Sequence, residues 1–194
     1  MTATSFPRLT FTRPIASGLV VLAALAALSG CKKGVEAKNE SAKSVAEKVD
    51  KSGEMAFQPG HWESTMKLEK MDVSGMNLPP AAKAAMQQQI GTEKNFDSCL
   101  TPEESKKPSS DFFKVADGCT YKTFSMSGGK INADMECKGA QGGDRTMKLA
   151  GTYTATTYSM HVEGSGQMPG GMSMSMAMLM NSKRTGECTG KEKS

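Results

Sequence analysis

Residues 119–137 read Cys-Thr-Tyr-Lys-Thr-Phe-Ser-Met-Ser-Gly-Gly-Lys-Ile-Asn-Ala-Asp-Met-Glu-Cys. At the midpoint, Ser127-Gly128-Gly129 fits a three-residue hairpin loop with glycine at the left-handed position. A hairpin centred on Gly128 pairs residues whose numbers sum to 256, as those of Cys119 and Cys137 do. Directly opposed cysteines lie close enough for a disulfide. This stretch therefore predicts an antiparallel hairpin closed by a Cys119–Cys137 bridge.

The same register sorts the side chains of the hairpin between two faces. On one face it places a mostly apolar set: Cys119, Tyr121, Thr123, Ala133, Met135 and Cys137. On the other face, Lys122 is expected to meet Asp134 as an opposite-charge cross-strand pair. One face of the hairpin is thus expected to be buried.

Cys99 and Cys188 remain once Cys31, which belongs to the export signal described below, is set aside. An even number of cysteines in an exported chain indicates a disulfide framework, so we predict a second bridge between Cys99 and Cys188. The alternatives are metal ligands or free thiols. The chain has no CxxC spacing to support a zinc site.

Alternating apolar and polar residues predict further strands over 62–69, 146–153, 157–163 and 172–180. Short loops between the later strands favour hairpin neighbours. Two helical signals lie between the first strand and the Cys119 hairpin. Pro80 opens a run of helix formers that extends to Ile90, and Thr101-Pro102-Glu103-Glu104 is a second, shorter helix start.

Residues 57–188 are therefore expected to form one disulfide-stapled domain that is mainly β (α+β). The expected architecture is an antiparallel meander of about six strands, either a curved sheet or a partly open barrel. One or two short helices are inserted after the first strand. Residues 189–194 are expected to be a frayed polar tail.

The N-terminal 30 residues have the pattern of an export signal. Arg8 and Arg13 precede an apolar run of 14 residues, 15–28, whereas spanning a bilayer takes about 20. Leu-Ser-Gly-Cys, ending at Cys31, resembles the bacterial lipoprotein lipobox. That resemblance implies cleavage after residue 30 and acylation of Cys31 with fatty acids such as palmitate. The alternatives are an uncleaved signal anchor or a plain secreted protein.

Lys32 follows the cysteine where the bacterial sorting pattern uses Asp for retention at the inner membrane. We therefore expect an outer-membrane lipoprotein that faces the periplasm. Residues 31–56 are rich in Lys, Glu, Ser and Ala, and we expect them to form a flexible tether, with at most a transient helix over 41–51.

The charge of the chain is nearly balanced. Of the 24 basic residues, two lie in the leader, which has none of the 20 acidic ones, so the mature charge is 22 minus 20, or +2. This balance argues against a nucleic-acid partner.

Sixteen methionines are unusual for this length, and five of them alternate along one segment. They are Met172, Met174, Met176, Met178 and Met180. We expect them to form the buried face of a strand, because methionine fills irregular cores. One alternative is a Cu(I) site, because thioethers are soft ligands, and Met160, His161 or Met168 could join it. The other is a flexible, exposed loop bordered by glycines.

Histidine is scarce, and both His61 and His161 are expected to be solvated. The sequence has no nucleophile elbow, HExxH motif or phosphate-binding loop. We therefore expect neither enzymatic activity nor a cofactor.

Several short motifs together resemble those of the DUF3617 family of uncharacterised proteobacterial envelope proteins. They are Pro59-Gly60-His61-Trp62-Glu63, Cys99-Leu100-Thr101-Pro102, Cys119, Cys137, residues 151–158 and Arg184-Thr185-Gly186-Glu187-Cys188. The resemblance covers residues 57–188 and implies export and four structural cysteines, but no activity. The expected function is a non-catalytic binding or envelope-maintenance module, held at the membrane by its lipid, with an apolar ligand or an envelope protein as partner. The alternative is a periplasmic Cu(I)-binding protein.

Overall fold

The structure, a computed structural model, describes residues 34–75, 78–106, 118–138, 143–168 and 171–192. The chain divides into two compact units, Met1–Cys31 and Lys32–Ser194, and every described residue belongs to the second. The expected signal peptide and Cys31 lie outside the described residues.

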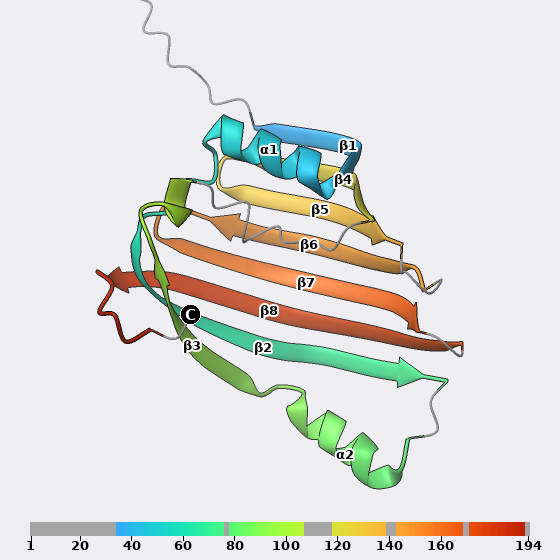
Figure 1. The fold of residues 1–194 in the computed structure, drawn as a ribbon. Helices are drawn as coiled ribbons and strands as arrows, with labels where there is room; N and C mark the ends of the chain where they lie inside the picture. Colours follow the sequence, from blue (N-terminus) through green and yellow to red (C-terminus); the bar gives the residue numbers. More distant parts are fainter. Residues whose placement is uncertain (1–33, 76–77, 107–117, 139–142, 169–170, 193–194) are drawn as a thin grey trace, which may run out of the picture. The chain divides into compact units, whose positions relative to one another are not determined.

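Within these described ranges, eight antiparallel strands form one open sheet in the order β1-β4-β5-β6-β7-β8-β2-β3 (Figure 1). Their bounds are β1 Val35–Ser41, β2 Gly60–Ser74, β3 Glu93–Leu100, β4 Cys119–Ser127, β5 Lys130–Cys137, β6 Arg145–Tyr153, β7 Thr157–Met168 and β8 Met172–Gly186. The predicted class and the meander, β4 to β8, are confirmed. The sheet has eight strands rather than about six, because β1 and β3 add an edge on either side.

The segment 31–56, expected to be a flexible tether, is ordered over most of its length. It contains β1, which pairs with β4, and helix α1, Ala42–Ser52 (Figure 1). Ser41 caps this helix by accepting a hydrogen bond from the backbone N–H of Ser44 at 3.2 Å. Val45 and Val49, one helical turn apart, are 0% and 1% exposed. Both valines belong to the buried core, so this face of the helix packs on the sheet, which corrects the tether prediction.

The two other helical signals are confirmed. Helix α2, Pro80–Gln89, follows β2 with a proline at its first position and has no buried residue. The 3₁₀ helix η1, Glu104–Lys106, is capped reciprocally. The hydroxyl of Thr101 accepts from the Glu104 backbone N–H at 3.2 Å, and the Glu104 carboxylate accepts from the Thr101 backbone N–H at 2.8 Å.

The β4–β5 hairpin confirms the predicted bridge and corrects the predicted turn. Cys119 faces Cys137, but at the other end Ser127 faces Lys130, so the register shifts by one residue. The turn therefore has two residues, 128 and 129, not three. Both are glycines with positive φ, 57° and 76°, a conformation that suits the type I′ turn of a two-residue hairpin.

A β-bulge at Lys122 accounts for the shift. Thr123, not Lys122, pairs with Asp134 and donates its hydroxyl hydrogen to that carboxylate at 2.9 Å. Lys122 instead forms an ion pair with Glu136 at 3.0 Å. Beyond the bulge, Phe124 takes the inward position that the unbroken register gave to Thr123, and it is 2% exposed.

The buried core lies on one face of the sheet, here called the inner face. It consists of Val35, Val45, Val49, Met55, Phe57, Trp62, Cys119, Tyr121, Phe124, Met126, Ile131, Ala133, Met135, Tyr153 and Met160. Helix α1 contacts β1 and β4 at one end of this face. Farther along, the chain after α1 brings Phe57 onto Trp62, with ring centroids 5.4 Å apart. Toward β8 and the far part of β2, the inward side chains are only half-buried.

Candidate functional site

A cavity of about 250 Å³ lies on the inner face across β6, β7 and β8, and we call it the methionine cavity. Its lining includes Met147 from β6, Gly164 and Gly166 from β7, and Met174 and Met176 from β8. The register explains the arrangement, because Gly164 pairs with both Met147 and Met176, and Gly166 pairs with Met174. The two glycines leave a gap between the methionines of the neighbouring strands.

Gly164 separates two methionine side chains that approach it from opposite sides. A Cβ atom placed at Gly164 would lie 3.5 Å from Cγ of Met176 and 3.9 Å from Cγ of Met147. These are ordinary van der Waals distances, so a methyl group fits above Gly164 without displacing either methionine. The two methionines therefore face each other across the glycine backbone.

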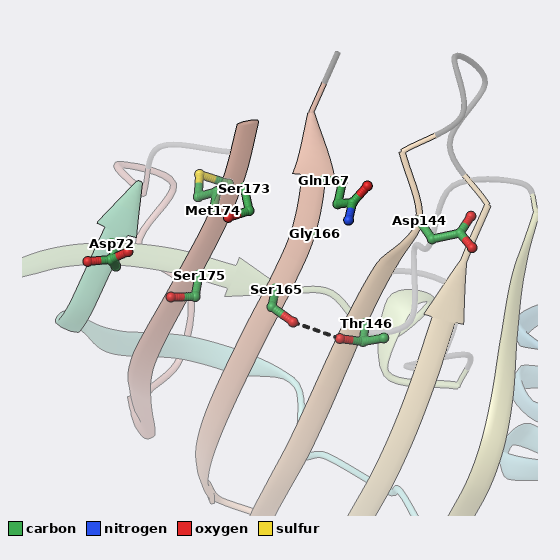
Figure 2. Close-up of a pocket in the computed structure, with 9 residues that line it drawn as sticks. All are labelled: Asp72, Asp144, Thr146, Ser165, Gly166, Gln167, Ser173, Met174 and Ser175. Atoms are coloured by element: carbon green, nitrogen blue, oxygen red, sulfur yellow. Dashed lines mark hydrogen bonds between the residues drawn. The ribbon is translucent and has the colours of Figure 1, made fainter. Parts of the chain in front are cut away.

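A second pocket, of about 410 Å³, is drawn in Figure 2. It lies on the opposite face of the sheet, because Ser165 and Ser175 alternate with the inward residues of β7 and β8. We call it the hydroxyl pocket; its polar lining residues are Asp72, Asp144, Thr146, Ser165, Gln167, Ser173 and Ser175. The hydroxyls of Thr146 and Ser165 are hydrogen-bonded at 2.8 Å. Asp144 forms an ion pair with Lys138 at 2.5 Å, and the lysine compensates the negative charge of the carboxylate. Thr146, Ser165 and Met174 line both spaces.

The structure divides the predicted methionine ladder among several environments. Met180 packs against the core, Met174 and Met176 line the methionine cavity, and Met178 lines a smaller cavity of about 150 Å³. Met172 lies at the start of β8. The strand itself is confirmed and the exposed-loop alternative is wrong, but these methionines are half-buried rather than fully buried.

The sequence prediction missed Met147 and included residues that lie elsewhere. Met160 is buried in the core, 5% exposed, and does not line the methionine cavity. His161 pairs with Leu179, so it faces away from Met178 and Met180, and its imidazole lies 3.0 Å from Glu69. The side chain of Met168 is outside the described part. The signal for Met147 was available: two inward-facing glycines in β7 mark a gap that the neighbouring strands line.

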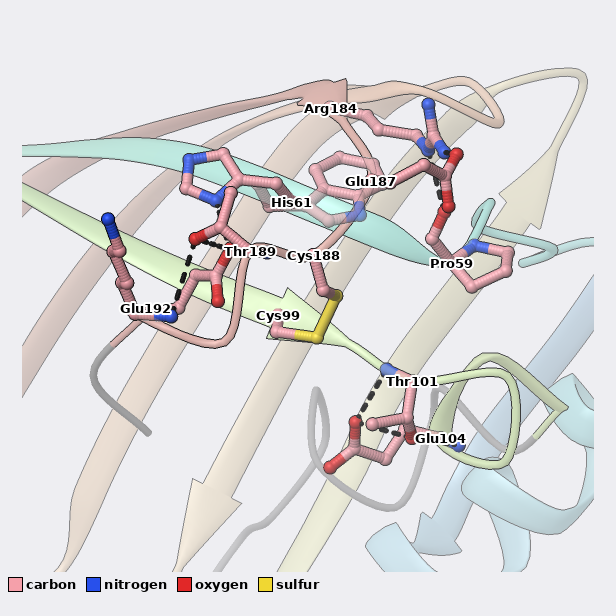
Figure 3. The surroundings of a disulfide bond; sticks show 12 residues. Pro59, His61, Cys99, Thr101, Glu104, Arg184, Glu187, Cys188, Thr189 and Glu192 are labelled. Carbon is pink, nitrogen blue, oxygen red and sulfur yellow. Dashed lines mark hydrogen bonds and ion pairs between the residues drawn. A yellow bond between two sulfur atoms is a disulfide. The ribbon is translucent and has the colours of Figure 1, made fainter.

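The predicted Cys99–Cys188 disulfide is present, with Cα atoms 5.4 Å apart, and Cys119–Cys137 has Cα atoms 3.9 Å apart. The Cys99–Cys188 bridge joins the end of β3 to the chain that follows β8, beside the start of β2 (Figure 3). His61 of β2 pairs with Cys99 on one side and with Gly186 on the other. The bridge therefore fastens both neighbours of β2 at its first residues.

Residues of the first and last sequence motifs meet beside this bridge. Arg184 donates from Nε to the backbone carbonyl of Pro59 at 2.7 Å and forms an ion pair with Glu187 (Figure 3). Gly60 has φ +140°, and a Cβ there would lie 2.2 Å from the carbonyl oxygen of Gly186. Only glycine fits this approach. The motifs thus have a structural explanation that requires no catalytic role.

His61 and the expected frayed tail differ from their predictions. His61 Nδ1 lies 2.6 Å from the carboxylate of Glu192, and their side chains are 19% and 3% exposed (Figure 3). Glu192 also accepts from the backbone N–H of Thr189 at 2.7 Å. Residues 189–192 therefore fold back onto β2, because the disulfide at Cys188 brings them within reach of His61.

These contacts shift two pKa values in opposite directions. The hydrogen bond with Glu192 raises the pKa of His61, assisted by the charges of Asp97 and Glu63. The pKa of Glu192 is lowered far below its ordinary range, first by the Thr189 backbone N–H and then by His61. Both shifts favour the charged pair.

In the described ranges, no helix is both long and apolar enough to cross a bilayer. Nor do these ranges contain a group of three or more His, Cys, Asp or Glu side chains arranged to hold a metal ion.

Comparison with known proteins places most of the chain in a family. Residues 57–188 match the family described as "Protein of unknown function (DUF3617)". No curated protein and no solved structure matches the chain. Because the match spans the sheet from β2 to β8 and both disulfides, this protein belongs to the DUF3617 family.

Proposed function

We propose that this protein is a lipid-anchored, non-catalytic binding module of the bacterial envelope, and that its methionine cavity holds a small apolar ligand. The observation that carries the proposal is the half-buried gap above Gly164, lined by Met147, Met174 and Met176. Ligand sites are typically concave and mostly apolar, with a few polar groups at the margin.

The chemistry of methionine supports a site that adapts to its ligand. Its unbranched side chain has several rotatable bonds and a polarizable sulfur, so methionine surfaces repack around different apolar groups. The volume, about 250 Å³, lies just below the usual range of ligand pockets, about 300–1,000 Å³. A small molecule, or the end of a longer chain, matches that size.

The anchor rests on the lipobox-like Leu-Ser-Gly-Cys that ends at Cys31. More than one acyl chain gives a durable hold on a membrane, whereas a single chain binds reversibly. Mass spectrometry of the protein from its bacterial envelope should find an acylated N-terminal Cys31, and Cys31→Ser should release the protein from the membrane fraction. An unmodified N-terminus would overturn the anchor while leaving the ligand site untouched.

The ligand site is tested by titrating the chain with 1-octanol and following the methyl resonances of ¹³C-labelled methionines. Saturable shifts are expected at Met147, Met174 and Met176. Gly164→Leu should abolish them, because its side chain fills the gap. Met178→Leu, outside the cavity, is the matched control and should bind like the wild type. Shifts that are absent, or that persist in Gly164→Leu, would reject the site.

A further inference from the structure

We propose that Met147, Met174 and Met176 form a Cu(I) site within the methionine cavity. The inference rests on the proposed function in one respect only, because both place a ligand in this cavity. It names a different class of ligand, a soft monovalent cation, and it depends on sulfur atoms rather than on apolar volume.

Two of the three thioethers approach each other from different strands. The Cγ atoms of Met147 and Met176 lie 3.9 Å and 3.5 Å from one point above Gly164, so they are at most 7.4 Å apart, the sum of the two distances. Each sulfur is one bond beyond its Cγ. Rotation about the Cβ–Cγ bonds can therefore direct both sulfurs toward one ion in the gap that Gly164 leaves open.

The third donor comes from the same strand as Met176. Met174 lies two residues earlier on β8, so its side chain has the same direction, and it lines the same cavity. Alternate residues along one strand are about 6.6 Å apart, since each residue rises about 3.3 Å. A ladder along β8 alone spaces its sulfurs widely, and Met147 from β6 supplies the convergence that the ladder lacks.

The donor set determines the metal. Three thioethers are soft ligands, which select Cu(I) over the hard cations and over ions that prefer imidazole or carboxylate. No histidine, cysteine or carboxylate is among the described residues that line this cavity. Arg145 also lines it, and its positive charge opposes a divalent ion more strongly than a monovalent one. The site therefore fits Cu(I), and Ag(I) as its redox-inert analogue.

The protonation behaviour of thioethers gives a second distinguishing property. Cysteine and histidine ligands must lose a proton before they bind a metal, so their affinity depends on pH. Methionine has no proton to lose. Binding at this cavity should accordingly change little between pH 5 and pH 8.

The test is a titration of the chain carrying Cys31→Ser, which removes the one cysteine outside the two disulfides. Ag(I), and Cu(I) supplied anaerobically as its acetonitrile complex, avoid the thiol reductants that would open those disulfides. Competition with a chromogenic Cu(I) chelator measures affinity, and ¹³C-methyl spectra locate the metal. We expect one ion per chain, with shifts confined to Met147, Met174 and Met176.

Leucine variants provide the matched controls, because Met→Leu nearly conserves volume and apolar character. Met147→Leu and Met176→Leu should each weaken Cu(I) binding at least tenfold, whereas Met178→Leu should leave it within twofold. An affinity that is absent in the wild type, or insensitive to both cavity variants, overturns the copper site. The double variant Met147→Leu/Met176→Leu should still bind 1-octanol, so loss of copper binding and loss of apolar-ligand binding are separately observable.

Discussion

Gly151 and Gly164 lie on neighbouring strands and face the same side of the sheet, but their surroundings differ. Gly151 of β6 pairs with Met160 of β7, and Gly164 of β7 pairs with Met176 of β8. A Cβ at Gly151 would lie 2.4 Å from the backbone oxygen of Ser159 and 2.9 Å from the sulfur of Met160. At Gly164 the nearest atom would be 3.5 Å away. One glycine permits a close backbone approach, and the other leaves a gap.

We therefore expect Gly151→Ala and Gly164→Ala to have different effects on stability. Gly151→Ala should lower the free energy of unfolding by about 1–3 kcal/mol, because the backbone of β7 must move. Gly164→Ala should change it by no more than about 1 kcal/mol, since alanine fits and reduces the entropy of the unfolded chain. Urea unfolding with intact disulfides measures both. Equal losses would show that the gap at Gly164 is already filled.

Among the secondary-structure elements, strong apolar alternation predicted the strands at β2, β6, β7 and β8, and all four are present. Helix α2, which has no buried residue, was predicted from its run of helix formers instead. Edge strand β3 was missed because its first five residues are exposed, so it has no buried face to impose alternation. β1 was missed, and α1 was expected only as a transient helix, because this segment has few apolar side chains; two of them, Val45 and Val49, are nevertheless buried.

In the β4–β5 hairpin, the sequence predicted the cysteine pair but not the exact strand register. The opposed cysteines and the two glycines limit the register to within one residue. The bulge at Lys122 is decided by which side chains the core accepts, and burial of Phe124 outweighs that of Thr123. The sequence did not predict the methionine cavity for a related reason. A cavity forms where a neighbouring strand lacks a side chain, and the pattern of residues along β8 does not include Gly164 of β7.

The chain after β8 depends on one charged pair and should respond to pH. The pKa of His61 is raised above its ordinary 6.5, so its interaction with Glu192 is complete below 6.5 and is lost as pH rises through the raised value. The pKa of Glu192 is lowered below its ordinary 4.5, so its contribution is complete above 4.5 and is lost as pH falls through the lowered value. Attachment of this segment should be firmest between pH 4.5 and 6.5.

Amide hydrogen exchange at residues 189–192 measures that attachment. Protection, corrected for intrinsic exchange, should be highest inside the window and decline on its alkaline side. Glu192→Gln, which keeps a hydrogen-bonding side chain but not the charge, should remove the pH dependence that His61 causes. Glu63 and Asp97, 4.0 Å and 3.8 Å from the imidazole, add smaller contributions. An unchanged alkaline profile in that variant would assign the effect to those two carboxylates.

At the scale of the whole domain, the two disulfides constrain different separations of the chain. Cys119–Cys137 joins neighbouring strands of one hairpin, 18 residues apart. Cys99–Cys188 spans 89 residues and connects β3 with the chain beyond β8, on either side of β2. β2 pairs with β8 although the whole meander from β4 to β8 lies between them in the chain, so this strand pairing is non-local. The Cys99–Cys188 bridge therefore links the two chain segments on either side of that non-local strand.

Removing the bridges in pairs tests this difference. In the loop-entropy account, Cys99→Ala/Cys188→Ala should lower the free energy of unfolding by about 4–5 kcal/mol, and Cys119→Ala/Cys137→Ala by about 3 kcal/mol. Cys119 is also 6% exposed, so its replacement leaves a small void that adds to the smaller figure. Chemical unfolding of the two double variants, each with its remaining disulfide verified by mass spectrometry, gives the comparison. If loss of the hairpin bridge costs more, packing around Cys119 rather than closure of the long loop limits stability, and the pairing of β2 with β8 forms without help from Cys188.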